Sequence, residues 1–314
     1  MRNSRPIVAD NATTGSGTDE AYLRQRAHTE NFPVALAVLP ARYRTHLRRL
    51  YDVARVIDDL GDEAKTDRSA ALLAFRAELD RIWHGGTARS PVRHELAGPE
   101  LAGHERVVRE LADSVVTCAL PEQPFLDLIE ANLRDQTTSV YATYDELLGY
   151  CELSANPVGR LVLAVFGSSS PERAALSDQV CTALQIIEHC QDVAEDHRAG
   201  RIYLPLADLD RFGVRRADLD AAVACPAVRE LVRFEVERAQ AMLVRGSALV
   251  GQLSGWARLA VAGYVAGGLA AATAMRRAEW SVLPSHPRSR RRDVLAGLLR
   301  LWLGVPARHL TESS

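Results

Sequence analysis

Residues 185–204, QIIEHCQDVAEDHRAGRIYL, constrain this chain more than any other stretch, because they set three acids into apolar sequence. Glu188, Asp192 and Asp196 recur every four residues, so in a helix they lie on one face over roughly two turns, about 12 Å of axis. Such acids repel one another, and no Lys or Arg stands four residues downstream of any of them. The apolar neighbours predict a buried helix whose acids face an internal cleft.

A second acidic cluster ends another apolar segment, residues 51–63, YDVARVIDDLGDE. Asp58 and Asp62 are four residues apart, as are Asp59 and Glu63. Two carboxylate pairs on separate helices suit hard divalent cations, and Mg²⁺ takes one or two protein carboxylates, keeps waters and binds substrate phosphates. A single pair of this kind is usually solvated surface. Two pairs in apolar sequence are equally consistent with a metal site and with a solvated surface.

The composition is that of an ordinary globular protein, with 47% hydrophobic and 25% charged residues among 314. This length allows one large domain or two ordinary ones. A net charge of −2 argues against nucleic-acid binding by the chain as a whole. The five cysteines are scattered without a CxxC pair, which indicates packed thiols in a reducing cytoplasm.

The two ends differ from the rest of the chain. Residues 1–19 lack an apolar run, so we expect a disordered tail and no signal peptide. Residues 259–275 are apolar but short and rich in Ala and Gly, which favours a core helix over a membrane span. Residues 276–308 contain eight Arg against two acids. We therefore expect a catalytic domain over residues 20–285 and a basic amphipathic tail over 286–314.

Helical periodicity dominates from residue 21 onward, and it predicts an all-α single domain around a central cavity. Helices are expected at 21–30, 40–63, 66–84, 105–117, 121–140, 143–153, 157–167, 171–200, 225–251 and 254–277, with an irregular segment at 85–103 and an extended one at 201–205. No GxGxxG, P-loop or GxSxG motif is present. A di-iron bundle would need ExxH pairs, which the chain lacks.

Mg²⁺ between the two acidic clusters would bind a diphosphate, and the nearby Arg55, Arg198 and Arg201 could complete the clamp. Surface salt bridging is the alternative role for Arg198 and Arg201. Neutralising a leaving diphosphate makes ionisation of a C–O bond possible without a protein nucleophile. The resulting carbocation needs an apolar, dry cavity. Phe32, Tyr51 and Tyr150 could stabilise it through their ring faces, although single aromatic residues are more often core.

These motifs resemble those of a known family. DDLGD at residues 58–62, with QDVAEDHRAGRIYLP at 191–205, is similar to the paired aspartate-rich motifs of the squalene and phytoene synthases. ENFPVALAVLP at 30–40 and YCELSANPVGRLVLAVFG at 150–167 resemble its branch of bacterial hydroxysqualene synthases. The resemblance covers about residues 21–285 and implies an isoprenoid-synthase-type helical bundle.

The resemblance also implies roles for individual residues. Asp58, Asp62, Asp192 and Asp196 match Mg²⁺ ligands, Tyr51 and Arg55 lie near the diphosphate and the reacting carbons, Val158 and Gly159 match tunnel-lining positions, and Gln185 matches a polar position in the cavity. Two departures concern the diphosphate site. Glu188 stands where a metal-binding Asn is common, and it can still bind Mg²⁺; Gln191 stands where many members have Arg, which removes one cation.

The implied reaction in this branch is ionisation of presqualene diphosphate, rearrangement and capture by water to give hydroxysqualene, in squalene and hopanoid biosynthesis. NADPH would be needed only for direct reduction to squalene. Head-to-head condensation of farnesyl or geranylgeranyl diphosphates is the alternative. A catalytically silent scaffold is a third hypothesis, which the retained acids disfavour.

The basic tail is expected to form one more helix. Val294, Leu295, Leu298, Leu299 and Trp302 share a helical face beside an Arg cluster. We expect either an interfacial helix that docks on anionic lipid, or a helix packed on the same protein. The protein is then cytoplasmic, with or without peripheral contact at the inner face of the membrane.

Overall fold

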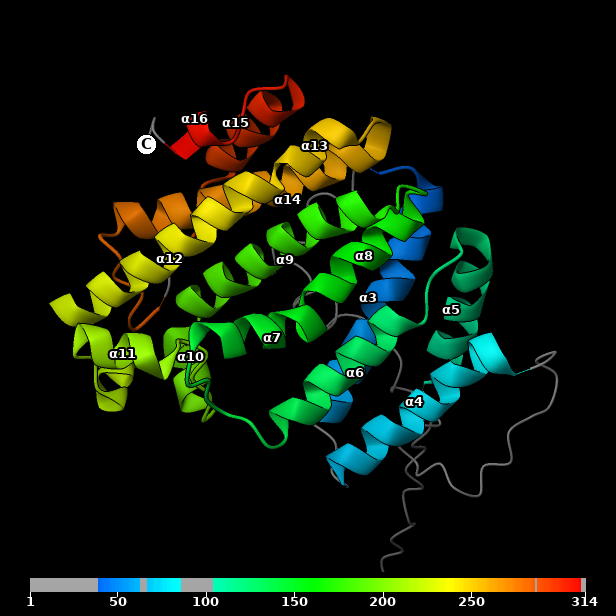
Figure 1. The fold of residues 1–314 in the computed structure, drawn as a ribbon, viewed down its shortest axis with the longest axis horizontal. Helices are drawn as coiled ribbons and strands as arrows, with labels where there is room; N and C mark the ends of the chain where they lie inside the picture. The colour runs from blue at the N-terminus through cyan, green and yellow to red at the C-terminus, as the bar shows by residue number, and fades with distance from the viewer. Residues whose placement is uncertain (1–38, 63–66, 86–103, 286, 312–314) are drawn as a thin grey trace, which may run out of the picture.

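The computed structural model describes residues 39–62, 67–85, 104–285 and 287–311 (Figure 1). The helices are α3 (Ala41–Asp62), α4 (Arg68–His84), α5 (Glu105–Cys118), α6 (Gln123–Asp135), α7 (Tyr144–Ser154), α8 (Asn156–Val165), α9 (Pro171–Gln191), α10 (Val193–Arg198), α11 (Leu206–Phe212), the 3₁₀ helix η1 (Arg216–Asp220), α12 (Pro226–Gly246), α13 (Ala248–Gln252), α14 (Gly255–Arg277), α15 (Arg291–Trp302) and α16 (Arg308–Thr311). The expected all-α fold is confirmed. Within these ranges the extended segment at 201–205 contributes one isolated β-bridge, between Val140 and Ile202.

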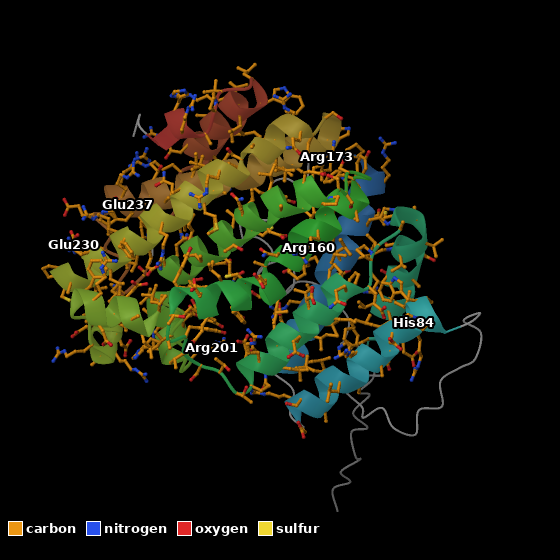
Figure 2. The ribbon with its side chains drawn as sticks, viewed as in Figure 1. His84, Arg160, Arg173, Arg201, Glu230 and Glu237 are labelled. Carbon is orange, nitrogen blue, oxygen red and sulfur yellow. The ribbon has the colours of Figure 1, made fainter. Side chains whose placement is uncertain are left out.

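Helix α9 runs through the middle of the molecule, between α12 on one side and α7 and α8 on the other (Figure 1). It begins where expected, because Pro171 occupies its first position and Ser170 Oγ accepts a hydrogen bond from the backbone of Arg173. Arg160 of α8 pairs with Asp178 of α9 at 2.8 Å (Figure 2). Two hydrophobic cores meet along α8, which contributes residues to both; one is built around α3 to α6 and the other around α9, α12 and α14.

Helix α14 is the core helix predicted from its small residues. A Cβ at Gly268 would lie 2.4 Å from Leu184 Cδ2 and 2.8 Å from Leu243 Cδ2, so the glycine lets α14 approach its neighbours closely. In the described part of the chain, α14 alone is long and apolar enough to cross a membrane, and 78% of its most apolar window is buried inside the protein.

The expectation of one continuous helix over residues 171–200 is wrong. Helix α9 ends at Gln191, Asp192 leaves the helical conformation at φ −97° and ψ 15°, and α10 follows. The backbone of Asp192 still donates to Glu188 O at 2.9 Å, and that of Asp196 donates to Asp192 O at 2.8 Å. The three acids therefore stay within one segment, but the break turns Asp196 toward His189, with 3.7 Å between Nδ1 and Oδ2.

Several other boundaries differ from the expected ones. The helix expected over 121–140 stops at Asp135, where Gln136 caps it and the chain turns toward the β-bridge. The helix expected over 225–251 is divided at Ser247 into α12 and α13. The short helices α11 and η1 were not predicted, because neither is long enough to show a helical period. The expected helix at 21–30 and the irregular segment at 85–103 lie outside the described residues.

The C-terminal helix α15 packs along α14 (Figure 1). Val294 and Leu298 contact the core and Leu301 is buried, and a Cβ at Gly297 would lie 3.2 Å from Ala266 Cβ. Leu295 and Leu299 remain 61% and 59% exposed. The predicted apolar face is therefore divided, with one half packed on the same protein and the other half facing solvent.

Candidate active site

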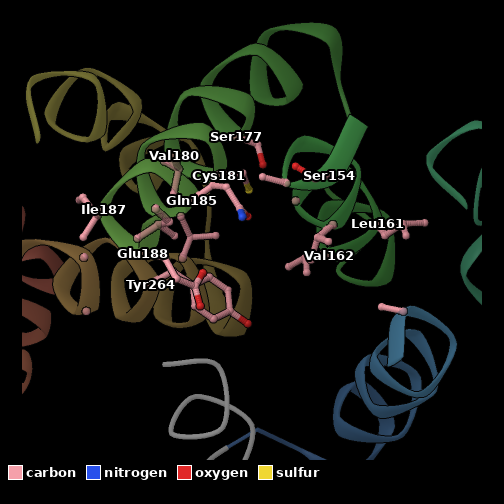
Figure 3. Close-up of a pocket in the computed structure, with 18 of the residues that line it drawn as sticks. Ser154, Leu161, Val162, Ser177, Val180, Cys181, Gln185, Ile187, Glu188 and Tyr264 are labelled. Atoms are coloured by element: carbon pink, nitrogen blue, oxygen red, sulfur yellow. The ribbon is translucent and has the colours of Figure 1, made fainter. Parts of the chain in front are cut away.

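A cavity of about 290 Å³ lies between α3, α8, α9 and α14 (Figure 3). Most of its lining is apolar, including Leu47, Leu50, Ala54, Leu128, Val162, Leu184, Leu249, Val261 and Ala271. Five predicted site residues line it: Tyr51, Val158, Gly159, Gln185 and Glu188. Gln191 does so as well, so the lining reaches the residue before Asp192. We call this space the reaction cavity and the part beside Glu188 and Gln191 its acidic end.

Gly159 has a steric role in this cavity. A Cβ there would lie 2.4 Å from Ser177 Oγ and 2.5 Å from Cys181 Sγ. No real Cβ tolerates such distances, so the glycine sets how closely α8 approaches α9. The position predicted as tunnel lining is thus also a packing position between two helices.

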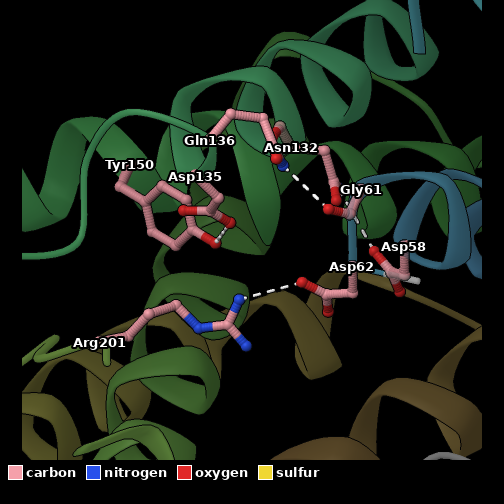
Figure 4. A network of polar contacts seen from close by, with 8 residues as sticks. All are labelled: Asp58, Gly61, Asp62, Asn132, Asp135, Gln136, Tyr150 and Arg201. Atoms are coloured by element: carbon pink, nitrogen blue, oxygen red, sulfur yellow. Dashed lines mark hydrogen bonds and ion pairs between the residues drawn. The ribbon is translucent and has the colours of Figure 1, made fainter. Parts of the chain in front are cut away.

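Arg201 links the two acidic motifs. Its Nη1 donates to Asp62 Oδ1 at 3.1 Å (Figure 4). Its backbone amide donates to Asp196 O at 2.8 Å. The nearby Tyr203, Asp62 and Asp135 raise the pKa of Arg201 although desolvation opposes them. The guanidinium therefore stays charged beside residues that were predicted to hold a cation and a diphosphate.

Asp58 lies one turn before Asp62 on α3. Asn132 of α6 donates to its Oδ1 at 3.3 Å (Figure 4). Desolvation by the surrounding protein raises the pKa of Asp58 to about 6, against the opposing effects of Asn132 and Arg55. The side chain of Asp58 is still exposed to solvent, and a carboxylate whose pKa is raised by desolvation is stabilised by added positive charge. A bound cation would supply that charge.

Three polar residues near the end of α6 were missed in the sequence. Gln136 Nε2 donates to Gly61 O at 3.0 Å, and Asn132 packs against Gly61, where a Cβ would lie 2.3 Å from Asn132 Oδ1. Asp135 accepts a hydrogen bond from the Tyr150 hydroxyl at 2.8 Å (Figure 4). Their spacing of three and four residues after an apolar run was the available signal.

Asp135 contacts a group of buried aromatic residues through Tyr150. Burial raises its pKa to about 6, although the hydrogen bond from Tyr150 opposes the shift. Tyr150 packs against Tyr203, which stacks on His189 with 3.8 Å between the ring centroids. This group connects α7 and α9 to the segment that carries Arg201.

The remaining predicted residues have other surroundings. Arg55 pairs with Asp59 at 2.8 Å, one turn along α3. Arg198 is exposed and lies 3.8 Å from Asp220, so its contact with a diphosphate stays a prediction. Phe32 lies outside the described residues.

The side-chain donors of the two acidic motifs fit Mg²⁺, because they are carboxylate oxygens, which this hard cation prefers. Asp58, Asp62, Glu188, Asp192 and Asp196 would hold it. A separate group of possible metal ligands, Asp80, His84 and Glu122, lies on α4 and before α6. His84 lies far from Arg201 in the view of Figure 2, and its exposed ion pairs at 2.9 Å and 3.9 Å explain that group without a metal.

This architecture defines an all-α enzyme of the isoprenoid-synthase type, with an apolar cavity whose lining includes Glu188 of the second acidic motif. Residues 25–294 match the squalene/phytoene synthase family, and the chain belongs to it. It is 33% identical to the hydroxysqualene synthase of Zymomonas mobilis over 224 residues, 69% of each chain.

Two further comparisons agree with this assignment. The chain is 32% identical to the phytoene synthase of Mycobacterium tuberculosis over 219 residues, 68% of this chain and 67% of that one. It is also similar to the crystal structure of the squalene synthase HpnC from Alicyclobacillus acidocaldarius, with a TM-score of 0.70, 41% identity and coverage of 84% and 95% of the two chains. Chemistry of the squalene and phytoene synthase type follows from these relationships.

Proposed function

We propose that the protein converts presqualene diphosphate to hydroxysqualene, with Mg²⁺ as cofactor. The observation that carries the proposal is the continuity of the reaction cavity, whose apolar lining leads to Glu188 and Gln191 beside the second acidic motif. A diphosphate and a long hydrocarbon chain need these two environments in one site. The similarity to a hydroxysqualene synthase supports the choice of reaction.

In the proposed reaction the C–O bond of the substrate breaks and diphosphate leaves with the electron pair. Mg²⁺, when bound, neutralises charge that develops on this leaving group. Arg201, held near Asp62 and Asp196, offers a second positive charge to the same oxygens. The apolar walls around Tyr51 and Val158 keep bulk water from the carbocation while it rearranges. One water then adds to carbon and loses a proton, so no reductant is consumed.

The alternative is head-to-head condensation of two farnesyl or geranylgeranyl diphosphates. The similarity to a phytoene synthase favours it, because that enzyme shares the family and has nearly the same identity to this chain. Both reactions begin with loss of diphosphate at an acidic end. They differ in whether one molecule of presqualene diphosphate or two separate prenyl diphosphates must occupy the cavity.

An end-point assay separates these functions. Presqualene diphosphate and farnesyl diphosphate are offered in separate tubes with Mg²⁺ and without NADPH, and the products are extracted and identified by mass. We expect hydroxysqualene from the first tube only. Consumption of farnesyl diphosphate assigns the condensation instead, and no product in either tube contradicts the proposal.

The metal assignment has its own test. Asp58→Asn and Asp192→Asn are each expected to abolish nearly all turnover while the helical circular dichroism stays unchanged. Asp80→Asn, in the separate group on α4, is the matched control and should keep parental turnover. Retained activity in either of the first two variants would contradict their role as Mg²⁺ ligands.

We also propose that this protein is cytoplasmic and touches the inner face of the membrane through the exposed half of α15. Leu295, Leu299 and Trp302 are exposed beside Arg291, Arg292 and Arg300. Such a face suits anionic lipid. Leu295→Glu with Leu299→Glu should weaken co-sedimentation with phosphatidylglycerol vesicles, whereas Val116→Glu on α5, at a residue 85% exposed, should not. Equal vesicle binding by the parent, the double variant and Val116→Glu would contradict the proposed membrane contact.

A further inference from the structure

A second cavity, of about 410 Å³, lies near the C-terminal helices. Its lining comes from the end of α12, from α13, from Arg258 of α14 and from the turn between α15 and α16. None of these residues takes part in the proposed reaction. The cavity therefore needs another explanation.

Helix α13 separates this second cavity from the reaction cavity. Leu249 lines the reaction cavity, whereas Ala248, Val250 and Gly251 line the second one. Helix α14 is shared in the same way, with Arg258 on the second cavity and Val261, one turn later, on the reaction cavity. Since α13 has five residues, one short helix forms this part of the wall between the two spaces.

Most of the large apolar side chains exposed in the described residues lie on α14, on α15 and in the turn after α15, and this turn also lines the second cavity. Eight large apolar side chains are exposed in the described residues. Five of them lie near the second cavity in the chain: Trp256, Leu295, Leu299, Trp302 and Leu303. We call these five residues the C-terminal apolar surface. Leu301 and Gly304 line the cavity while Trp302 and Leu303 between them face solvent, so one turn contacts both. Arg258 Nη2 donates to Trp302 O at 2.7 Å and holds that turn in place.

Hydrocarbon release poses a physical problem that these features answer. If the proposed function holds, the product is a long uncharged alcohol, which has lost the diphosphate that bound the acidic end. Moving its apolar area through water costs about 25 cal/mol per Å². A route that passes directly from the cavity to lipid avoids this cost.

We propose that the hydrocarbon product leaves the reaction cavity across α13. Leu249 is the barrier, the second cavity receives the hydrocarbon chain, and the C-terminal apolar surface delivers it to an anionic bilayer. This inference rests on the proposed function for the identity of the product. The route itself is a property of the walls around α13, and it is tested without catalysis.

The test follows the loading of radiolabelled squalene from phosphatidylglycerol vesicles into the full chain. Leu249→Ala removes the barrier and should speed loading several-fold. Gly251→Trp should slow it several-fold, because the indole fills the second cavity. The backbone at Gly251 accepts a side chain, since a Cβ there would meet no atom within 4 Å. Thermal melting of both variants verifies that they fold.

Two matched controls make the result specific to this route. Leu79→Ala opens a comparable hole at a buried leucine of α4 that lines neither cavity, and Leu73→Trp adds an indole on the same helix; both should load at the parental rate. Unchanged loading in the Leu249 and Gly251 variants overturns the proposal, as does equal acceleration by Leu79→Ala. Because squalene is not turned over in this assay, a wrong assignment of the enzymatic substrate leaves the result interpretable.

Discussion

Glu235 is a carboxylate with no exposed surface in the middle of α12. Arg238 Nη2 donates to it and to Asp208 Oδ2, the latter at 3.1 Å, while the guanidinium lies 3.3 Å from the Tyr144 ring centroid. Burial raises the pKa of Glu235 to about 7, although Arg238 opposes the shift. The contacts of Arg238 join α7, α11 and α12. They leave a buried carboxylate at Glu235 whose negative charge Arg238 compensates only in part.

The raised pKa of Glu235 predicts how stability varies with pH. The folded protein binds this proton more tightly than the unfolded chain, whose pKa is near 4.5, so the free energy of unfolding falls as pH rises from about 4.5 to 7. The full loss is about 3 kcal/mol, at 1.36 kcal/mol per pKa unit. Glu235→Gln removes the titrating carboxyl group and with it this pH-dependent loss of stability. Urea unfolding should therefore show that the unfolding free energy of Glu235→Gln increases relative to that of the parent as pH rises.

Glu237, on the exposed face of the same helix, supplies the control for this experiment. Glu237→Gln should leave the pH dependence of unfolding unchanged. A constant difference in unfolding free energy between Glu235→Gln and the parent, from pH 4.5 to 8, would show that Glu235 titrates normally.

Gly61 is the second residue whose environment makes a clear prediction. In Gly61→Ala the new methyl group overlaps Asn132 Oδ1 and pushes the amide away from Asp58. We expect about 1 kcal/mol of lost stability, the usual contribution of one hydrogen bond, and lower turnover because Asp58 loses its orientation. Chemical unfolding and steady-state kinetics measure the two effects. Parental values for both would show that Asn132 does not position Asp58.

At the scale of elements, local signals predicted the helices well. Pro171 and Thr143 mark helix starts that the structure confirms, and Thr143 Oγ1 accepts from the backbone of Glu146. The break at Asp192 left no such mark, because the backbone hydrogen bonds on either side of it continue. Cavity residues on α9 followed from their spacing and the family resemblance. Asn132 meets Asp58 across 74 positions, a contact that no local pattern encodes.

The close approach of α8 to α9 gives a prediction for the pair of elements. Gly159→Ala forces these helices apart around Ser177 and Cys181 and should cost about 1–3 kcal/mol, the usual range for overpacking, with reduced turnover. Gly149→Ala on α7 is the matched control. Its Cβ meets no atom within 4 Å, so it should stabilise the protein by about 0.5–1 kcal/mol through helix propensity. Denaturant midpoints of the two alanine variants measure these effects. If both substitutions shift the midpoint in the same direction, the steric argument for Gly159 is wrong.

At the scale of the whole molecule, the site joins two cores. Asp58 and Asp62 extend from the core around α3 to α6, and Glu188 and Asp192 lie at the end of α9 in the other core. Arg201 bridges both through Asp62 and Asp196. A ligand that binds both motifs therefore stabilises the contact between the two halves of the fold.

This arrangement predicts that Mg²⁺ and inorganic diphosphate stabilise the protein together. Binding to the folded state adds RT ln(1 + [L]/Kd), about 2.7 kcal/mol at a hundredfold excess over Kd, which raises the melting temperature by several degrees. Diphosphate in the presence of EDTA should change the melting temperature little, because without Mg²⁺ the carboxylates repel the diphosphate. Asp62→Asn and Asp192→Asn should each remove most of the rise, whereas Asp80→Asn keeps it. If the rise survives EDTA, or survives in both site variants, diphosphate binds elsewhere, and the two acidic motifs do not form one site.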